Sequence, residues 1–238
     1  MLRTGLLAAA FATLPAIALA GDQADREIVG FSPDGGIFVF EEYGIEDGSG
    51  FPYSSIYAIE TDTDSWVAGT PFRIRLEDDG ATLHAARAAA RAAAAQLIDE
   101  RGIGPGYNLL ASNPLTEISA DPHEVRFVTH PHMAASNPGW TVSIVEKELP
   151  AAGCPADLGG PFRGFALTLT DPDGNARTLH DDTRIPSSRK CPTNYGISDV
   201  ISAYTDGGPV LVILVNMFSL GFEGPNRRFL AVAARFAG

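Results

Sequence analysis

The densest cluster of chemically active side chains lies in the stretch FEEYGIEDGSGFPY, residues 40–53. Neighbouring carboxylates can act as general acid and base, and carboxylates beside aromatic rings can bind a sugar or a peptide. The favoured interpretation of this stretch is a solvated loop between two strands, and a binding site is the alternative. The candidate residues are Glu41, Glu42, Asp47, Ser49 and Tyr53, with the distant Arg189 as a basic partner.

No catalytic centre can be assembled from recognisable spacings. The sequence SSRK, from Ser187 to Lys190, has the S-x-x-K spacing with which a helical lysine activates a serine. Pro186 and the pair Cys191-Pro192 flank this motif, so a helical turn cannot readily form around it. We therefore expect no catalytic residue here.

Three histidines lie close enough in the sequence to meet at one metal ion: His123, His130 and His132. A proline and a loop-like segment surround the last two, and no carboxylate stands at a recognised metal spacing. Two acidic turns, at residues 62–64 and 171–175, begin like a calcium loop but lack the glutamate that completes one. We predict no metal site and no cofactor.

The first twenty residues, MLRTGLLAAAFATLPAIALA, have the parts of a secretory signal peptide. Arg3 provides the basic start, an apolar run follows, and Ala18-Leu19-Ala20 is a small-residue cleavage site. We predict cleavage after Ala20, which leaves residues 21–238 as a single secreted or periplasmic β-rich domain. A membrane anchor is less favoured, because the apolar run is shorter than the roughly 20 residues that span a bilayer.

The chain has two cysteines, Cys154 and Cys191. In an exported chain an isolated pair forms a disulfide more often than two free thiols, and this pair lacks the C-x-x-C spacing of a redox site. We predict a disulfide between them. On the chain-entropy model it stabilises the fold by about 4 kcal/mol.

Most of the remaining chain has the pattern of short antiparallel strands. The sequences SPDG, at residues 32–35, and DPDG, at residues 171–174, have the preferences of type I turns between strands. Strands 37–43 and 210–218 carry apolar residues on both faces, so we expect each to be central and covered on both sides. Residues 105–122 have the composition of a loop, and we expect a further strand over residues 198–205.

The sequence ATLHAARAAARAAAAQLIDER predicts one helix, over residues 82–101 and ended by Gly102. Its alanines and leucines share one arc, which is flat enough to lie close on a sheet and cover it. His84, Arg87 and Arg91 lie on the other side. We interpret them as a solvated polar face, and anion binding is the alternative.

These elements predict a mainly β fold of antiparallel hairpins, with two packed sheets and the alanine-rich helix laid on one of them. The hairpin GFSPDGGIFVFEEYG is also typical of a propeller blade, so a propeller-like fold is the alternative. A propeller requires a repeat of about 40 to 50 residues, and the chain has only one short internal echo.

The chain is acidic, with a formal net charge of −12. Nucleic acids and anionic membranes are polyanions that need a basic surface, so we exclude them as main partners. The apolar run VLVILVNMF is too short for a membrane helix, so we expect no membrane span in the mature chain. The sequence identifies no partner, and a periplasmic protein is one candidate class.

Three stretches carry a resemblance to a known family. They are GFSPDGGIFVFEEYGIEDGSGFPYSSIYAIETDTDSWVAGTP, PSSRKCP and GFEGPNRRFLAV. Together with the signal peptide and the alanine helix, they resemble the bacterial family of predicted secreted proteins called domain of unknown function 2259. The resemblance implies export and a single family domain, and it brings no catalytic residues.

We predict a non-catalytic binding or envelope-associated protein. The alternative is a hydrolase that acts on envelope glycan or peptide, with Glu42, Asp47 and Arg189 as its working residues. These three side chains would then have to meet in one site, which a structure can test.

Overall fold

The computed structural model describes residues 21–130, 138–151, 153–154 and 160–236, so the predicted signal peptide lies outside the described residues. Within those ranges the chain forms thirteen strands in three antiparallel sheets, and one α-helix. The prediction of a mainly β fold with one helix is confirmed.

The first sheet, which we call the helix-side sheet, comes from the N-terminal third of the chain. Its strand order is β1-β2-β3-β4, and β5 also pairs with β3. At the predicted SPDG turn the N–H of Gly35 donates to the carbonyl of Ser32 at 2.8 Å. The strands are β1 (Asp25–Phe31), β2 (Ile37–Ile45), β3 (Pro52–Glu60), β4 (Ser65–Trp66) and β5 (Phe72–Arg75).

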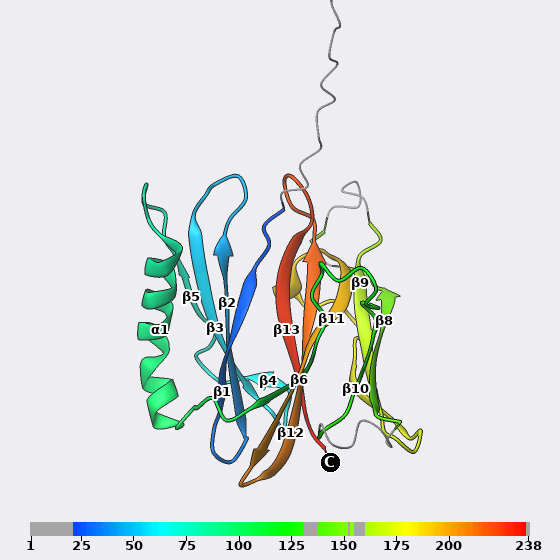
Figure 1. Cartoon of the computed structure of the whole chain (residues 1–238). Coiled ribbons are helices and arrows are strands. Elements are labelled where there is room, and N and C mark those ends of the chain that lie inside the picture. The colour runs from blue at the N-terminus through cyan, green and yellow to red at the C-terminus, as the bar shows by residue number, and fades with distance from the viewer. Residues whose placement is uncertain (1–20, 131–137, 152, 155–159, 237–238) are drawn as a thin grey trace, which may run out of the picture.

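Helix α1 (Leu83–Glu100) covers one face of this sheet (Figure 1). The hydroxyl of Thr82 caps its start by accepting the N–H of Ala85. Its end has the geometry of a Schellman cap, because Gly102 has a φ of 60° and the N–H of Ile103 donates to the carbonyl of Ile98. The predicted boundaries of the helix are therefore correct to within a residue.

The other two sheets share the rest of the chain. The outer sheet has the order β10-β9-β8-β7 and the middle sheet has the order β13-β12-β11-β6. The outer strands are β7 (Glu124–Phe127), β8 (Trp140–Glu148), β9 (Arg163–Thr170) and β10 (Ala176–Asp181). The middle strands are β6 (Asn108–Ser112), β11 (Pro192–Thr205), β12 (Gly208–Ser219) and β13 (Asn226–Arg235).

Helix and sheets stack as four layers: α1, the helix-side sheet, the middle sheet and the outer sheet (Figure 1). A separate hydrophobic core fills each of the three gaps. We expected two packed sheets, and the structure has three. The sequence did not show the third, because hydrophobic periodicity reports which faces of a strand are buried and not which sheet the strand joins.

The two strands predicted to be covered on both faces are confirmed as such. In β2, Val39 packs toward the helix, while Phe38 and Phe40 pack toward the middle sheet. In β12, Val212 faces the helix-side sheet and Ile213 faces the outer sheet. Each strand is apolar throughout because it lies between two cores.

The layers argue against the propeller-like alternative. Blades of a propeller follow one another in space as they do along the chain. Here the outer sheet follows the helix-side sheet in the sequence, yet the last three strands of the chain form the layer between them. The C-terminal strands thus form the central layer of the fold.

Two predicted boundaries are wrong. Strand β6 lies within residues 105–122, which we expected to be a loop, and it pairs with β11 only over a short stretch interrupted by a register shift. Strand β11 begins six residues before the predicted residue 198, because register shifts after Pro192 and Ile197 let the strand continue through a segment with no regular alternation.

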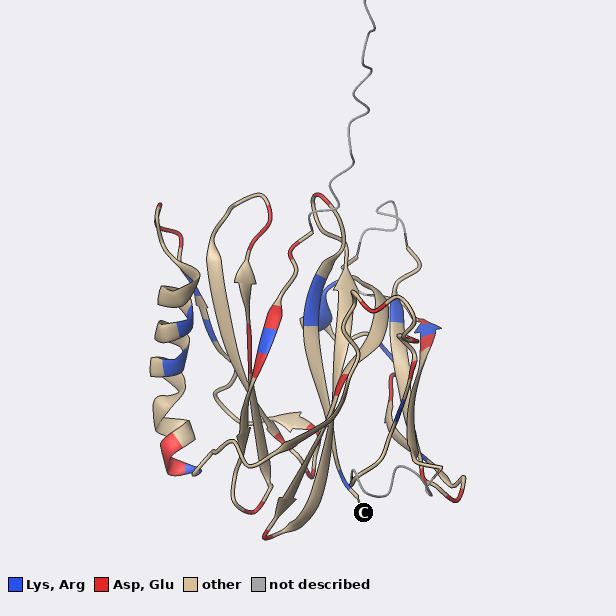
Figure 2. Cartoon of the chain, in the orientation of Figure 1, with Lys and Arg blue, Asp and Glu red and all other residues tan. Residues whose placement is uncertain are grey.

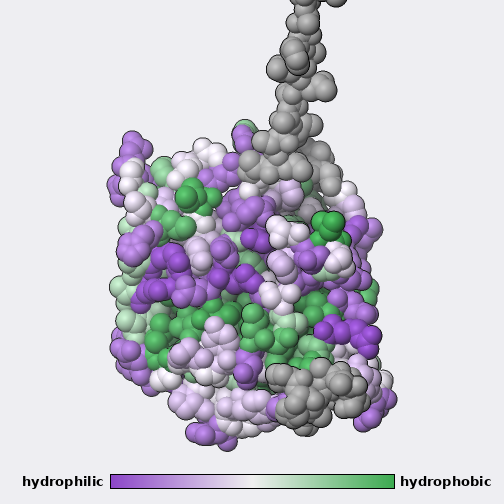
Figure 3. Space-filling view, viewed as in Figure 1, coloured by the Kyte–Doolittle hydropathy of each residue, from purple (hydrophilic) through white to green (hydrophobic). Residues whose placement is uncertain are grey.

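The exterior is not uniformly polar. In the view of Figure 3, hydrophilic side chains form a band across the upper half, and hydrophobic side chains gather below it. Exposed apolar residues include Leu109, Ile118, Val145 and Phe222. Scattered exposed apolar side chains are common on protein surfaces, so we build no site on them.

Candidate functional site

A cavity of about 760 Å³ lies along the free edge of β13. Strand β13 is the last strand of the middle sheet, and residues of the helix-side and outer sheets line the cavity on either side of it. The cavity is therefore a cleft with β13 as its floor and the two neighbouring sheets as its walls. Its size is typical of ligand sites.

One wall of the cleft comes from β3, β4 and β5. The guanidinium of Arg73 lies over the rings of Tyr57 and Trp66, with its Cζ 6.0 Å and 5.4 Å from their centroids. Among the described residues, no carboxylate forms an ion pair with Arg73. This wall thus presents an exposed cation held by two aromatic rings.

The opposite wall includes the short 3₁₀ helix η3 (Ser187–Arg189) and Lys190. The prediction that no helical turn forms around the SSRK motif is therefore wrong, because a single 3₁₀ turn fits after Pro186, with the N–H of Arg189 donating to the carbonyl of Pro186 at 3.0 Å. Lys190 has a φ of 56°, a left-handed conformation that favours glycine. The ammonium of Lys190 also has no ion-pair partner in the part of the chain that the structure describes. A lysine at a position suited to glycine adds a second free cation to the cleft.

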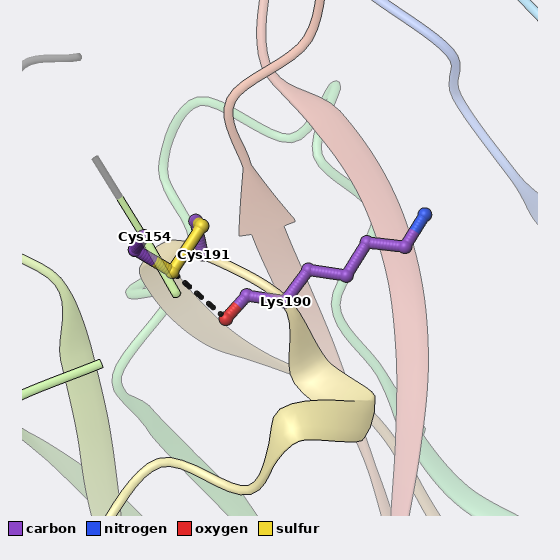
Figure 4. Close-up of a disulfide and its surroundings, with 3 residues drawn as sticks. All are labelled: Cys154, Lys190 and Cys191. Atoms are coloured by element: carbon purple, nitrogen blue, oxygen red, sulfur yellow. Dashed lines mark hydrogen bonds between the residues drawn. A yellow bond between two sulfur atoms is a disulfide. The ribbon is translucent and has the colours of Figure 1, made fainter. Parts of the chain in front are cut away.

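The disulfide Cys154–Cys191 anchors this wall, and its prediction is confirmed. The two Cα atoms lie 5.6 Å apart. Figure 4 shows the Lys190 side chain extended away from the disulfide. The main-chain carbonyl oxygen of Lys190 lies 3.4 Å from the Sγ of Cys154. A disulfide sulfur has no hydrogen to donate, so this is a packing contact. The covalent link fixes the chain next to Lys190.

A buried ionic cluster supports the same wall. The Nε2 of His180 donates to Asp182 at 2.9 Å, and Arg189 also forms an ion pair with Asp182. The ring of His180 stacks on Phe165 with centroids 4.6 Å apart. Asp182 pairs with both His180 and Arg189, and Asp64 lies 3.8 Å from the Nδ1 of His180, so two carboxylates balance the two cations and the cluster holds the wall in place instead of offering free charge.

Hydrogen bonding shifts the pKa values of His180 and Asp182, the pair at the centre of this cluster. Burial lowers the pKa of His180, but its contacts with Asp182 and Asp64 outweigh burial and raise this pKa to about 9. Burial raises the pKa of Asp182, but donors on His180, the Phe165 N–H and Arg189 lower it to about 2. At neutral pH the pair is an imidazolium and a carboxylate.

Two carboxylates mark the ends of the free edge of β13. The Oε2 of Glu42 accepts the N–H of Phe229 at 2.6 Å, and the Oδ1 of Asp64 accepts the N–H of Ala233 at 2.9 Å. Asp64 has a φ of 48°, which turns its residue out of the regular strand path. Each carboxylate satisfies one outward N–H of the edge strand.

Glu42 lies at the buried end of the cleft. Burial raises its pKa to about 7, although Arg228, whose Nε is 3.7 Å from Glu42, and the N–H of Phe229 oppose this shift. Close by, Tyr53 donates to Asp22 at 3.0 Å. Burial also raises the pKa of Tyr53, so its hydroxyl stays protonated.

Only some of the six predicted site residues line the cleft. Glu42, Tyr53 and Arg189 line the cleft. Asp47 and Ser49 lie in the β2–β3 loop, and neither lines the cleft; Ser49 donates to Glu46 instead. The three residues of the hydrolase alternative thus do not share one cavity.

Glu41 faces away from the cleft, toward α1. It has no exposed surface and accepts hydrogen bonds from Ser54, Arg87 and Arg91. Arg87 and Arg91 also pair with Glu27. Figure 2 shows basic positions of α1 at the same height as acidic positions of the adjacent helix-side sheet. The prediction that these arginines form a solvated face is therefore wrong: their long side chains reach past the alanine stripe to the sheet.

The histidines considered for a metal site lie apart in the structure. His123 contacts the carbonyl of Tyr195 through Nε2, and His130 packs against Tyr204. His132 lies outside the described residues. Within the described ranges, the structure brings no group of three metal-ligating side chains together. Asp171 of the acidic turn accepts N–H groups within its own turn.

Sequence reasoning missed Arg73, Trp66, Lys190, His180 and Asp64, which all line the cleft. Arg73 alternates with apolar Phe72 and Ile74, a signal that its side chain faces the opposite side of the strand from theirs. No pattern in the sequence shows that this face lies beside the edge strand of the neighbouring sheet.

Comparison with known families adds a match over most of the chain. A family model described as predicted secreted protein, domain of unknown function 2259, matches residues 39–235. The chain belongs to this family. All three sheets and the cleft of this chain lie largely inside the matched range.

No curated protein matches the chain. In the residues that the structure describes, none of the helical segments has the length and apolar character needed to cross a membrane.

Proposed function

We propose that the chain is a secreted, non-catalytic binding protein whose cleft takes an elongated, carboxylate-bearing ligand. One observation carries the proposal: a cleft of about 760 Å³ is lined by two cations, Arg73 and Lys190, that have no ion-pair partner among the residues described, in a chain of net charge −12. Free cations beside aromatic rings favour an anionic ligand with some apolar surface.

Secretion is consistent with the family description and with the disulfide. The proposed export signal is cleaved after Ala20, and residues 21–238 then form one secreted domain, in the periplasm or outside the cell. The family description and the disulfide support this location, since disulfides persist in oxidising compartments. The expected ligands are therefore envelope-associated peptides or glycans.

Binding is favoured over hydrolysis by the state of the acidic groups near the cleft. Glu42 already accepts the N–H of Phe229 and lies beside Arg228, and Asp47 is not among the lining residues. A general acid and base pair must reach the same bond. These two carboxylates do not meet that requirement.

Trp66 provides a direct test, because it lines the cleft whereas Trp140 packs on Phe236 outside it. In a Trp140→Phe variant, Trp66 is the sole indole of the mature chain. Tetraglutamate and tetragalacturonate serve as probes. Saturable quenching by either probe, weaker at high salt, supports the proposal. Quenching by neither probe contradicts it, and cleavage of a bound probe contradicts the non-catalytic assignment.

Matched variants locate the binding. Arg73→Gln removes one free cation, and Lys190→Gly removes the other at a φ that suits glycine. Each should weaken binding about tenfold, or about 1.4 kcal/mol, without loss of stability. Arg101→Gln, at the exposed end of α1, removes the same charge outside the cleft and should leave the affinity unchanged.

A further inference from the structure

We propose that the ligand is an extended peptide segment of another protein, which adds to the middle sheet as a strand beside β13. The inference rests on the proposed function and names the ligand class of the same cleft. A sheet edge binds such a segment through main-chain hydrogen bonds, and pockets for alternate side chains provide the selectivity.

The direction of the backbone along β13 carries the inference. The N–H groups of Arg227, Phe229 and Ala233 point away from β12, to Asp22, Glu42 and Asp64. Since N–H directions alternate along a strand, the N–H and C=O of Ala231 point the same way. Among the described residues neither group has a hydrogen-bond partner, and Ala231 lines the cleft.

The same edge already accepts a strand at one end. Gln23 forms a parallel bridge with Arg227, through bonds from the Arg227 N–H to Asp22 and from the Ala24 N–H to Arg227. This pairing stops where Glu42 takes the N–H of Phe229. Ala231 is the next outward residue, so the edge is open there and paired or capped on either side.

The capped positions set the length of the segment. Phe229 and Ala233 are four residues apart, which is about 13 Å along a strand. Glu42 and Asp64 occupy the N–H groups at these two positions. The open stretch therefore accepts about three extended residues, with the central one exchanging both main-chain bonds with Ala231.

Side-chain alternation then predicts the sequence of that segment. Ala231 packs toward the helix-side sheet, and residues opposite each other in neighbouring strands point to the same face. The central residue of the peptide thus faces the wall with Arg73, Tyr57 and Trp66. An acidic side chain fits there, and its two neighbours face the wall that holds Phe165.

The probe is acetyl-Val-Glu-Val-amide, titrated into the Trp140→Phe protein with Trp66 fluorescence as the readout. Ala231→Pro removes only an outward N–H, because the β12 ladder does not use it, and proline is tolerated at such edge positions. Ala231→Ser keeps the N–H and is the matched control. We expect Ala231→Pro to weaken peptide binding at least tenfold and Ala231→Ser to leave it within twofold.

A modified peptide tests the same bond from the ligand side and needs no protein variant. N-methylation of the glutamate removes the N–H that would donate to the carbonyl of Ala231, and we expect at least tenfold weaker binding. Strand addition is overturned if the parent and N-methylated peptides bind equally well, or if wild type and Ala231→Pro bind the parent peptide equally well.

Other outcomes separate this inference from the proposed function. Binding of tetragalacturonate by Ala231→Pro and wild type alike, without peptide binding, overturns strand addition and leaves the proposed function standing. A dimer by light scattering that dissociates in Ala231→Pro would identify a second copy as the occupant and overturns the inference of a different protein. Absence of binding by every probe overturns both.

Discussion

Glu41→Gln tests whether the first predicted site residue serves folding or binding. The Glu41 carboxylate has no exposed surface and accepts hydrogen bonds from Arg87 and Arg91 at 2.8 to 3.0 Å and from Ser54 at 2.8 Å. A glutamine keeps the shape of the side chain. It removes the charge, however, and turns an NH₂ group toward a guanidinium.

The expected loss of stability in Glu41→Gln follows from the burial of the Glu41 carboxylate. Breaking a buried ion pair by removing one partner costs about 3 to 5 kcal/mol. The side chains of Arg87 and Arg91 retain 24% and 48% of their exposure and keep Glu27 as a second partner. We therefore expect the lower end, about 3 kcal/mol. Glu27→Gln is the matched control: Glu27 is 49% exposed, so its loss should cost less than about 1 kcal/mol.

Urea unfolding followed by tryptophan fluorescence measures both variants. Burial raises the pKa of Glu41, but hydrogen bonds from Arg87, Arg91 and Ser54 outweigh burial and hold this pKa below its usual value. The stabilisation is therefore complete above about pH 5 and is lost as the pH falls through the folded-state pKa. The difference in the free energy of unfolding between wild type and Glu41→Gln should therefore become smaller in acid.

Two results would refute this reasoning. One is a Glu41→Gln protein that unfolds within about 0.5 kcal/mol of wild type at pH 7, since the ion pairs would then contribute nothing. The other is a loss of probe binding without a loss of stability, because Glu41 lies on the face of its strand opposite the cleft.

Three further predictions concern stability. Replacing Cys154 and Cys191 by serine should lower the free energy of unfolding by about 4 kcal/mol, since the bond closes a loop of sequence separation 37; an unchanged urea midpoint contradicts this. The pKa of His180 is raised to about 9, so its stabilisation, about 3 kcal/mol, is complete below about pH 6 and lost as the pH rises through 9. His180→Gln should then be less stable than wild type at pH 6 and similar at pH 10, and a gap that is constant with pH argues against it. The pKa of Glu42 is raised to about 7, so its ionisation destabilises the fold as the pH rises above about 4.5. Glu42→Gln should gain stability relative to wild type between pH 5 and 8 in urea unfolding, and a relative loss at pH 8 would show that the ionised form is the stabilising one.

Much of the fold could be predicted from the sequence because its signals are local. The SPDG turn, the helix cap at Gly102 and the alanine stripe each depend on neighbouring residues. The two-faced apolar strands β2 and β12 were correctly placed between cores for the same reason. The third sheet and the position of the outer sheet depend on pairings between distant strands, which no local pattern reports.

The candidate site was predictable only in part. Glu41 and Glu42 are consecutive residues of β2, so their side chains point to opposite faces of the sheet. Glu41 pairs with the arginines of α1, whereas Glu42 lies at the buried end of the cleft. Their different roles follow from what each face meets, α1 in one case and the edge of β13 in the other. Arg73 and Lys190 come together in the cleft only because the middle sheet ends at β13.

The most direct test of the central claim is calorimetric titration of the wild-type protein and an Arg73→Gln, Lys190→Gly double variant with tetraglutamate and its uncharged analogue tetraglutamine. If the cleft selects carboxylates, tetraglutamate should bind wild type at least tenfold more tightly than tetraglutamine, and this preference should vanish in the double variant. An unchanged preference in the double variant, or no heat of binding with wild type, contradicts the account.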